Sequence, residues 1–165
     1  MTQLRIAIVT VSDRSSRGER EDLSGPALEQ IVISNEWQVV EKTIVPDEKL
    51  DIQAVLIGWS ANDEVDVILT TGGTGFAPRD ITPEATKEII DRETPGLVEA
   101  MRAESLKITK HAILSRATAG IRDKTLIINL PGSPKAAVEN FNVIASVLEH
   151  AVQLLREDPK AEDNH

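Results

Sequence analysis

The sequence predicts a three-layer α/β/α sandwich built around a mostly parallel sheet with one antiparallel strand pair. Short apolar, β-branched runs alternate along the chain with longer segments whose apolar residues recur at helical spacing. Polar or glycine-rich loops follow the early apolar runs, as expected for strands that connect through helices. A short connection at 122–124 between two later apolar runs predicts the antiparallel pair. Residues 1–155 are expected to form a single domain, and 156–165 a polar C-terminal tail.

The first half of the chain is predicted to contain three strands separated by two helices. Residues 4–11 are almost entirely apolar and β-branched, which is typical of a strand buried on both faces of a parallel sheet. The elements expected here, in chain order, are a strand over 4–11, a polar loop over 12–22, a helix from Ser24-Gly25-Pro26, a strand over 39–45, a helix from Pro46-Asp47-Glu48 and a strand over 66–70.

The second half is predicted to begin with two helices and to end with a long one. Helices are expected over 83–91 and 95–106, strands over 113–121 and 125–130, and a last helix with Ser133 as its N-cap and Pro134 as its first residue. Apolar residues recur along this last helix at helical spacing, so that face is expected to be core or subunit interface.

Composition excludes several classes of function. The formal net charge of −9 argues against nucleic acid as the main partner. The absence of cysteine excludes disulfides, thiolate nucleophiles and cysteine-based zinc sites. No apolar stretch approaches the length of a membrane span, and the N-terminus leads directly into a strand pattern without a signal peptide. The protein is therefore expected to be soluble and cytoplasmic, with no membrane partner.

The segment Thr70-Thr71-Gly72-Gly73-Thr74-Gly75 is the strongest functional signal. It follows an apolar run and leads towards a helix that Pro83 can start, so its backbone N–H groups could hold a phosphate. It lacks the Lys-Ser/Thr ending of a P-loop and does not match G-x-G-x-x-G, and no G-x-G-x-x-G follows the first strand, which disfavours a dinucleotide-binding oxidoreductase. The nearby Asp80 suggests a metal ion, although a plain glycine-rich connection stays open.

Four loops that follow predicted strands carry polar residues or glycines. They are Ser12-Asp13-Arg14, Pro46-Asp47-Glu48, the segment 70–75 (the glycine turn) and Pro131-Gly132-Ser133. Ligands of open α/β sheets bind outside the carboxyl ends of the strands, so these loops are expected to converge on one site. The residues alone leave simpler roles open: Asp80 as a turn residue or partner of Arg79, Asp47 as a helix N-terminal acid, Ser133 as only an N-cap and Lys135 as a solvated side chain.

The sequence of residues 70–86 resembles the molybdopterin-binding signature of Mog/MoaB-type molybdenum cofactor biosynthesis proteins and of gephyrin-like G domains. The resemblance covers nearly the whole chain. It also includes Val11-Ser12-Asp13-Arg14, Asp22-Leu23-Ser24-Gly25, Val45-Pro46-Asp47-Glu48, Asp91-Arg92-Glu93, Ile113-Leu114-Ser115-Arg116 and Asn129-Leu130-Pro131-Gly132-Ser133-Pro134-Lys135.

The resemblance implies a Mg²⁺-dependent molybdopterin adenylyltransferase. Such an enzyme transfers AMP from ATP to the terminal phosphate of molybdopterin, releases pyrophosphate and passes its product to a molybdenum insertase. The alternative is a non-catalytic molybdopterin carrier or scaffold of the same pathway. Arg79-Asp80 favours the enzyme, because a less competent branch of the family lacks that pair. Family members are homo-oligomers, commonly trimers; trimer against hexamer, molybdenum against tungsten, and the loop that seats adenine stay open.

Roles for individual residues follow from the same resemblance. The implied catalytic residues and metal ligands are Asp47 and Asp80. The implied molybdopterin- or phosphate-binding residues are Ser12, Asp13, Thr71, Gly72, Gly73, Thr74, Gly75 and Arg79. The implied nucleotide-binding residues are Pro131, Gly132, Ser133 and Lys135.

Overall fold

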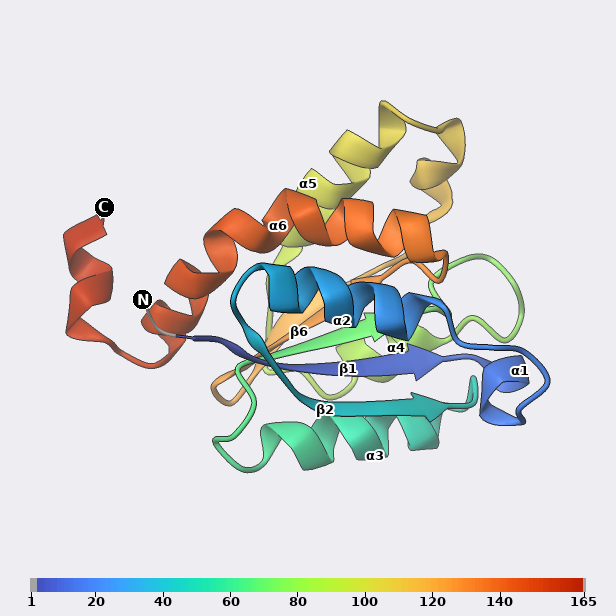
Figure 1. The fold of residues 1–165 in the computed structure, drawn as a ribbon, viewed down its shortest axis with the longest axis horizontal. Helices are drawn as coiled ribbons and strands as arrows, with labels where there is room; N and C mark the ends of the chain where they lie inside the picture. The colour runs from blue at the N-terminus through green and yellow to red at the C-terminus, as the bar shows by residue number, and fades with distance from the viewer. Residues whose placement is uncertain (1–2, 165) are drawn as a thin grey trace.

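The computed structural model describes residues 3–164 and has three layers, with a six-stranded sheet between two layers of helices (Figure 1). Residues 1, 2 and 165, at the outer ends of the predicted domain and tail, lie outside the described part. The strands are β1 (Arg5–Val11), β2 (Gln38–Val45), β3 (Val67–Thr71), β4 (Arg92–Glu93), β5 (Ala119–Arg122) and β6 (Thr125–Leu130). Their order in the sheet is β2-β1-β3-β6-β5-β4.

Helices cover both faces of this sheet. They are α1 (Asp13–Ser16), α2 (Ser24–Ser34), α3 (Lys49–Ser60), α4 (Thr82–Lys87), α5 (Pro95–Leu106) and α6 (Pro134–Leu155), with 3₁₀ segments η1 (Lys110–Leu114) and η2 (Pro159–Asn164). One face carries α2, α5 and α6, and the other carries α3 and α4 (Figure 1). Among residues 3–164, no helix combines the length and the apolar character needed to cross a membrane.

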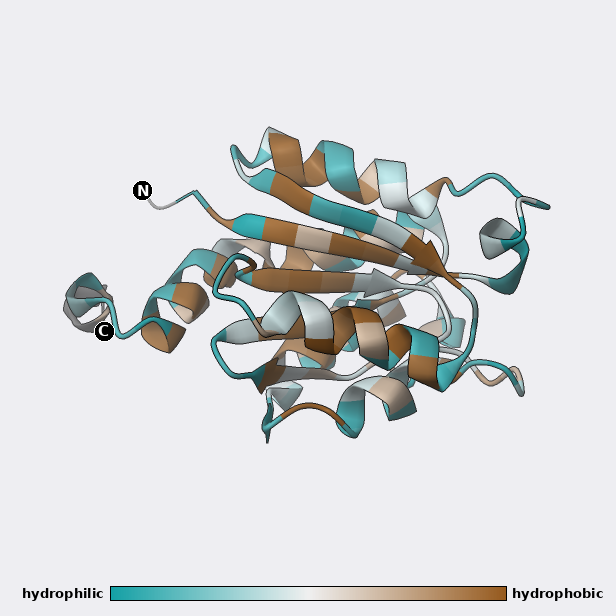
Figure 2. Cartoon of the chain, turned by 90° about the horizontal axis from the view of Figure 1, so that it is seen from below, coloured by the Kyte–Doolittle hydropathy of each residue, from teal (hydrophilic) through white to brown (hydrophobic). Residues whose placement is uncertain are grey.

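The central strands are apolar because both of their faces are covered. In β1, Ile6 and Ile8 pack in the core under α2 and α6, while Ala7 and Val9 pack in the second core under α3. Successive strand residues point to opposite faces, so a strand between two helical layers needs apolar residues at every position. The strands inside the sheet are accordingly hydrophobic along most of their length, and hydrophilic residues gather in the loops (Figure 2). The predicted sandwich is confirmed.

The predicted antiparallel pair is β5 with β6, and the rest of the sheet differs in detail from the expectation. The expected strand over 113–121 is wrong in its first part. Residues Lys110–Leu114 form η1, because the Thr109 side chain caps that turn by accepting from the N–H of His111. The two-residue strand β4, which the sequence did not indicate, adds a second antiparallel pairing with β5.

Two other segments also depart from the predicted boundaries. The helix expected over 83–91 ends at Lys87, and the chain then turns towards β4 because the N–H of Asp91 donates to the carbonyl of Ile121 at 2.7 Å. The polar loop after β1 contains the single helical turn α1, whose N-cap Ser12 accepts from the N–H of Ser15 at 3.1 Å. The N-cap predicted at Ser133 is confirmed, since its hydroxyl accepts from Ala136.

The strand order fixes where a ligand can bind. The chain leaves β1 towards β2 on one side and returns to β3 on the other, so the topological switch point lies between β1 and β3. The loops that follow these two strands diverge there and leave a crevice at the carboxyl edge of the sheet. The loop 12–22 and the glycine turn after β3 form the two sides of this crevice.

At the amino ends of the central strands, Asp66 joins the start of β1 to the residue that follows α6. Its side chain is 4% exposed, accepts from the N–H and guanidinium of Arg5 at 2.7 to 3.2 Å, and pairs with Arg156 beyond the end of α6. Arg156 also contacts Asp63 at 3.1 Å. Burial alone would raise the pKa of Asp66, but the hydrogen bonds from Arg5 and the charges of Arg156 and Arg5 outweigh it and hold the pKa below its usual value.

Replacing Asp66 with Asn is expected to destabilise the fold by about 2 kcal/mol, less than a fully buried pair would lose because both arginines keep contact with water. The wild-type contribution is present above the unfolded-state pKa of the carboxyl group and is lost as the pH falls through the depressed folded-state value. The stability difference between wild type and Asp66→Asn should therefore shrink in acid. Urea unfolding at pH 7 and below pH 4 measures both, and a difference independent of pH would contradict the charge argument.

Candidate functional site

The carbonyl groups of the glycine turn are held by the surrounding scaffold. The Gly72 carbonyl accepts from the Thr82 hydroxyl at 2.9 Å, and the Gly73 carbonyl accepts from the Thr82 N–H at 3.1 Å. Arg116 holds the next two, donating its N–H to Thr74 and its Nε to Gly75, both at 2.8 Å. Within residues 3–164, the N–H groups of Gly73, Thr74 and Gly75 have no protein acceptor. The turn therefore has fixed carbonyls and free donors, as an anion cradle requires.

Two positions of the turn require glycine. Gly72 has φ +104°, and a Cβ atom there would lie 2.3 Å from the carbonyl oxygen of Val11. Gly73 has φ +69°, and its Cβ would lie 2.3 Å from the Thr82 hydroxyl. The backbone of the turn thus passes directly against β1 and against the start of α4. Because only glycine combines this φ with so close an approach, the two glycines are explained by the shape of the turn.

Asp80 lies at the end of the same loop. One of its carboxylate oxygens accepts from the N–H of Ala77 at 3.0 Å. Asp80 therefore acts as a turn residue, which is one of the roles that the sequence left open. Its carbonyl is held by Arg116 at 2.5 Å, and Arg116 also pairs with Glu84. Asp80 makes no ion pair with Arg79 among the described residues, since Arg79 has other partners. The Asp80 side chain borders a polar cavity together with Asp47.

This polar cavity has a volume of about 380 Å³ and lies at the switch point. Gly72 and Gly73 line it from one side, and Gly132 and Ser133 line it at the start of α6. Thr71 connects the two turns, because its hydroxyl donates to the Pro131 carbonyl at 2.7 Å. A Cβ on Gly132 would lie 3.2 Å from the Cα of Gly72, so the two turns touch. They form one continuous wall of backbone.

Acidic side chains dominate the rest of the cavity wall. Asp22 lines it while accepting from the Thr10 hydroxyl at 2.8 Å and from the N–H of Gly25 at 3.1 Å. Arg20 is the one Lys, Arg or His residue among the described residues that line this cavity. A ligand carrying several negative charges would therefore meet backbone N–H groups, one arginine and four acidic residues, which calls for a cation as counter-charge.

The loops after β1 and β2 are joined by reciprocal hydrogen bonds. The N–H of Asp13 donates to Asp47 Oδ2 at 2.8 Å, and the N–H of Asp47 donates to Asp13 Oδ1 at 3.0 Å. Arg79 donates its Nε to Asp13 at 2.6 Å and its Nη2 to Asp13, to Glu48 and to the Asp47 carbonyl at 2.7 to 3.1 Å. The Asp47 side chain therefore turns to the β1 loop and does not cap α3, whose N-cap is Glu48.

Asp13 and Asp47 experience different electrostatic surroundings. The hydrogen bonds from Arg79 lower the pKa of Asp13, and the pairing with Asp13 and Glu48 raises the pKa of Arg79. Burial raises the pKa of Asp47, and the neighbouring charges of Asp13 and Asp80 act in the same direction. A cation between Asp47 and Asp80 would reverse this repulsion. The two carboxylates therefore fit a divalent metal ion, although no cluster of three or more acidic, His or Cys ligands occurs within residues 3–164.

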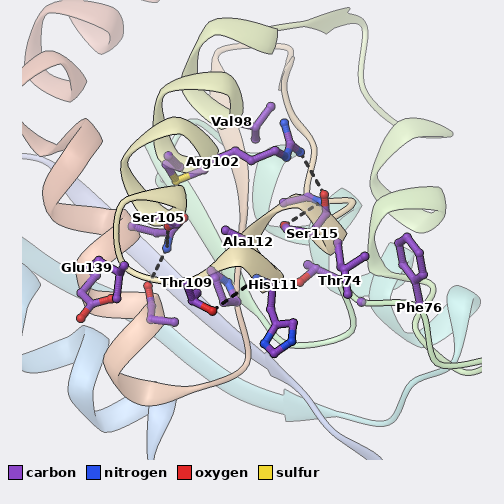
Figure 3. Close-up of a pocket in the computed structure, with 18 residues that line it drawn as sticks. Thr74, Phe76, Val98, Arg102, Ser105, Thr109, His111, Ala112, Ser115 and Glu139 are labelled. Carbon is purple, nitrogen blue, oxygen red and sulfur yellow. Dashed lines mark hydrogen bonds between the residues drawn. The ribbon is translucent and has the colours of Figure 1, made fainter.

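A second, apolar cavity of about 390 Å³ lies on the other side of the glycine turn (Figure 3). Thr74 and Gly75 line it from the turn, and Val98, Met101 and Leu114 supply apolar walls from α5 and η1. Polar residues also line this cavity, and they include Arg102, Ser105, Thr109, His111, Ser115, Glu139 and Asn140. The glycine turn thus separates a polar cavity from an apolar one, and its free N–H groups lie at the boundary.

The structure brings together most of the residues that the sequence indicated. The predicted residues that line the polar cavity are Ser12, Asp47, Thr71, Gly72, Gly73, Asp80, Gly132 and Ser133. Thr74, Gly75 and Pro131 line the apolar cavity. Asp13 and Arg79 line neither cavity and form an ion pair with each other. Lys135 borders neither cavity; its side chain is 83% exposed and lies 3.9 Å from Glu139.

Sequence reasoning missed the roles of Arg116, Thr82, Asp22 and Arg20. Arg116 belongs to the segment Ile113-Leu114-Ser115-Arg116, which resembles the family. Its role could not be predicted, because nothing in the sequence shows that its side chain reaches the carbonyls of Gly75 and Asp80. Thr82 could have been found, since a hydroxyl residue directly before the helix-starting Pro83 is well placed to bond the preceding loop. The contacts of Asp22 and Arg20 with the cavity come from the path of the loop 12–22.

Fold and site together define an α/β protein with a glycine-rich anion cradle and a carboxylate pair at the switch point of a mostly parallel sheet. A family model described as a probable molybdopterin binding domain matches residues 7–150, and the chain belongs to this family. The predicted relationship to Mog/MoaB-type proteins is confirmed.

Individual relatives agree with this assignment. The chain is 43% identical to a molybdopterin adenylyltransferase of Helicobacter pylori over 94% of its own length and 89% of that protein. It is 46% identical to the molybdenum cofactor synthesis protein cinnamon of Drosophila melanogaster over 96% of its length, but it spans only 26% of that longer relative and 23% of a Dictyostelium discoideum gephyrin. The crystal structure of the molybdopterin biosynthesis enzyme MoaB from Thermus thermophilus superposes with a TM-score of 0.89 at 48% identity, covering 95% of this chain and 99% of that one.

Proposed function

We propose that the protein is a molybdopterin adenylyltransferase. It transfers AMP from ATP to the terminal phosphate of molybdopterin and releases pyrophosphate. The observation that carries this proposal is the glycine turn, whose free N–H groups lie between a polar cavity and an apolar one. A two-substrate reaction between phosphates needs such a cradle where its two ligands meet. The similarity to adenylyltransferases over most of the chain supports the same reaction.

The two cavities suit different parts of the substrates. The apolar cavity has the walls that a flat heterocycle such as a pterin prefers, and its edge is the turn that would hold the pterin phosphate. The polar cavity has Ser133 at the N-terminus of the 22-residue helix α6, which favours an anion, so it would take the nucleotide phosphates. In the reaction, a molybdopterin phosphate oxygen bonds the α-phosphorus of ATP while the bond to the leaving pyrophosphate breaks. The nucleophile is already an anion, so no strong base is needed.

Asp47 and Asp80 would hold a Mg²⁺ ion in this reaction. Mg²⁺ in phosphoryl-transfer sites is usually bound by one or two carboxylates, with substrate phosphates and water as the other ligands, which matches two carboxylates on one cavity wall. The ion would neutralise charge that develops on the phosphate oxygens. Asp47 and Asp80 orient it, Arg20 adds positive charge to the wall, and the backbone of Gly73 to Gly75 fixes the acceptor phosphate.

Pyrophosphate release by the purified protein tests the proposal. The full mixture contains molybdopterin, ATP and Mg²⁺, and each is omitted in turn. Release that requires all three is the expected result. Saturable molybdopterin binding without any release would mean that the protein is a carrier or scaffold and that the catalytic proposal is wrong.

The wider setting follows from the same proposal. We infer that residues 1–155 act as one domain, with 156–165 as a C-terminal tail, in a cytoplasmic homo-oligomer of three copies that passes its product to a molybdenum insertase. The exposed apolar residues Val147 and Leu154 on α6 are compatible with a subunit contact. Sedimentation at several protein concentrations distinguishes a trimer from other states.

A further inference from the structure

The loop that carries Asp47 is tied to the loop after β1 by an unusually complete set of contacts. Asp13 and Asp47 each donate a backbone N–H to the other's carboxylate, at 2.8 and 3.0 Å. Each loop therefore caps the other. Such a pair fixes the side-chain torsions of both acids, because rotation of either carboxylate breaks a hydrogen bond to the facing backbone.

The carboxylate oxygens of the two acids are used differently. Both oxygens of Asp13 accept from Arg79, and Oδ1 also accepts from the N–H of Asp47, so Asp13 is fully engaged. Asp47 Oδ2 accepts from Asp13, whereas Oδ1 has no donor among the described residues. A Cβ on Gly73 would lie 3.2 Å from this Oδ1, so the free oxygen faces the glycine turn.

Arg79 occupies the centre of this arrangement. Its Nη2 contacts Asp13, the Asp47 carbonyl and Glu48, so one guanidinium holds the side chain of one loop and the backbone of the other. Arg79 itself comes from the loop after β3. Three loops that follow three adjacent strands, β2, β1 and β3, are therefore joined by one cation. Lysine could not reproduce this, because it lacks the planar fork that bonds a carboxylate with two parallel donors.

We propose that Arg79 and Asp13 are positioning residues that set Asp47 with its free oxygen towards the metal ion and phosphates of the polar cavity. This rests on the proposed adenylyl transfer, and it gives Arg79 and Asp13 a role other than direct contact with phosphate. Neither residue lines the polar cavity, and Arg79 already has three acidic or carbonyl partners. Its Nε and Nη2 are both engaged by these partners.

Metal binding by variants tests this role. Mn²⁺ binding, followed by electron paramagnetic resonance in the presence of ATP, is measured for wild type, Arg79→Lys and Asp13→Asn. Loss of an outer residue that orients a metal ligand typically weakens metal binding roughly 10- to 100-fold, and both variants are expected to fall in this range. The half-saturating Mg²⁺ concentration for pyrophosphate release should rise by a similar factor, while KM for molybdopterin stays within about twofold.

Arg17→Ala is the matched control. Arg17 pairs with Glu19 through two parallel hydrogen bonds at 2.9 and 3.0 Å on the surface of the same loop, away from both cavities. This variant removes a bidentate pair similar to that of Arg79 with Asp13. Because the pair of Arg17 and Glu19 does not contact Asp47, Mn²⁺ binding should be unchanged. Circular dichroism and thermal unfolding show whether each variant is folded; if Arg79→Lys is not, Asp13→Asn carries the test.

Two results would overturn the proposal. Unchanged Mn²⁺ binding in folded Arg79→Lys and Asp13→Asn would mean that the contacts are structural only. A raised KM for molybdopterin or ATP with normal metal binding would mean that Arg79 contacts phosphate directly. Absence of turnover in the wild type would instead contradict the proposed function, and the Mn²⁺ measurement would still separate the variants.

Discussion

Replacing Asp80 with alanine is expected to lower the rate of pyrophosphate release by about a thousand-fold, or roughly 4 kcal/mol of transition-state stabilisation. The variant loses one of the carboxylates on the wall of the polar cavity, the one that we propose binds the metal ion together with Asp47. Molybdopterin binding should persist, because in our proposal the free N–H groups of Gly73 to Gly75, and not this side chain, would hold its phosphate. Single-turnover kinetics and equilibrium binding of molybdopterin measure the two effects separately.

The turn contact of Asp80 makes a second variant informative. Asp80→Asn keeps an oxygen that can accept from the N–H of Ala77, which Asp80 holds at 3.0 Å, so the loop should retain its shape. Its turnover should nevertheless fall as far as that of the alanine variant to within about tenfold, because a neutral amide is a poor Mg²⁺ ligand. Asp51→Ala on the exposed face of α3 removes the same charge and should leave turnover unchanged. Wild-type rates in Asp80→Ala would eliminate the metal-ligand role.

Replacing Gly72 with alanine is expected to cost about 4 kcal/mol of folding stability or to prevent folding. The left-handed φ of +104° contributes about 1–3 kcal/mol of strain, and the added Cβ would lie 2.3 Å from the Val11 carbonyl, so β1 and β3 must move apart. For a protein of this size the loss corresponds to a decrease in Tm of about 8–16 °C. Thermal unfolding followed by circular dichroism measures it.

Two other glycines separate the causes of this loss. Gly18 has φ +73° but open space around its Cα, so Gly18→Ala should show the conformational cost alone, about 1 kcal/mol. Gly58 lies within α3, also with open space, and Gly58→Ala should be neutral or stabilising by up to about 1 kcal/mol. If Gly72→Ala were no worse than Gly18→Ala, the close approach of the turn to β1 would not be important for stability.

Much of the fold could be predicted because its central strands are buried on both faces. The apolar runs at 4–11 and 125–130 allow few alternatives once helical segments surround them. The same logic failed at Ile113 and Leu114, which are apolar but 62% and 42% exposed in η1. Local hydrophobicity does not distinguish a buried strand from exposed apolar residues in a short 3₁₀ helix.

The candidate site was predictable where backbone chemistry decides it and unpredictable where long side chains do. Glycines after a strand, and acids in neighbouring loops, meet because parallel strands end at one edge of the sheet. The partners of Arg79 and Arg116 could not be deduced in this way. Arg79 reaches Asp13 across 66 residues of sequence, and Arg116 reaches the Gly75 carbonyl across 41. Such pairings depend on the final placement of three loops, which sequence spacing does not encode.

The carboxylate of Asp66 has a consequence for how this domain can occur in larger proteins. Arg5, at the start of the first strand, and Arg156, just beyond the last long helix, bind the same side chain, so a polypeptide enters and leaves the domain at one place. That place lies at the amino ends of the central strands, whereas the loops that line the polar cavity follow their carboxyl ends (Figure 1). A domain with adjoining entry and exit can be inserted into a longer chain, or fused at either end, without strain on its fold or obstruction of its cavities. The long relatives from fly and Dictyostelium, of which this chain spans about a quarter, are compatible with such modular use.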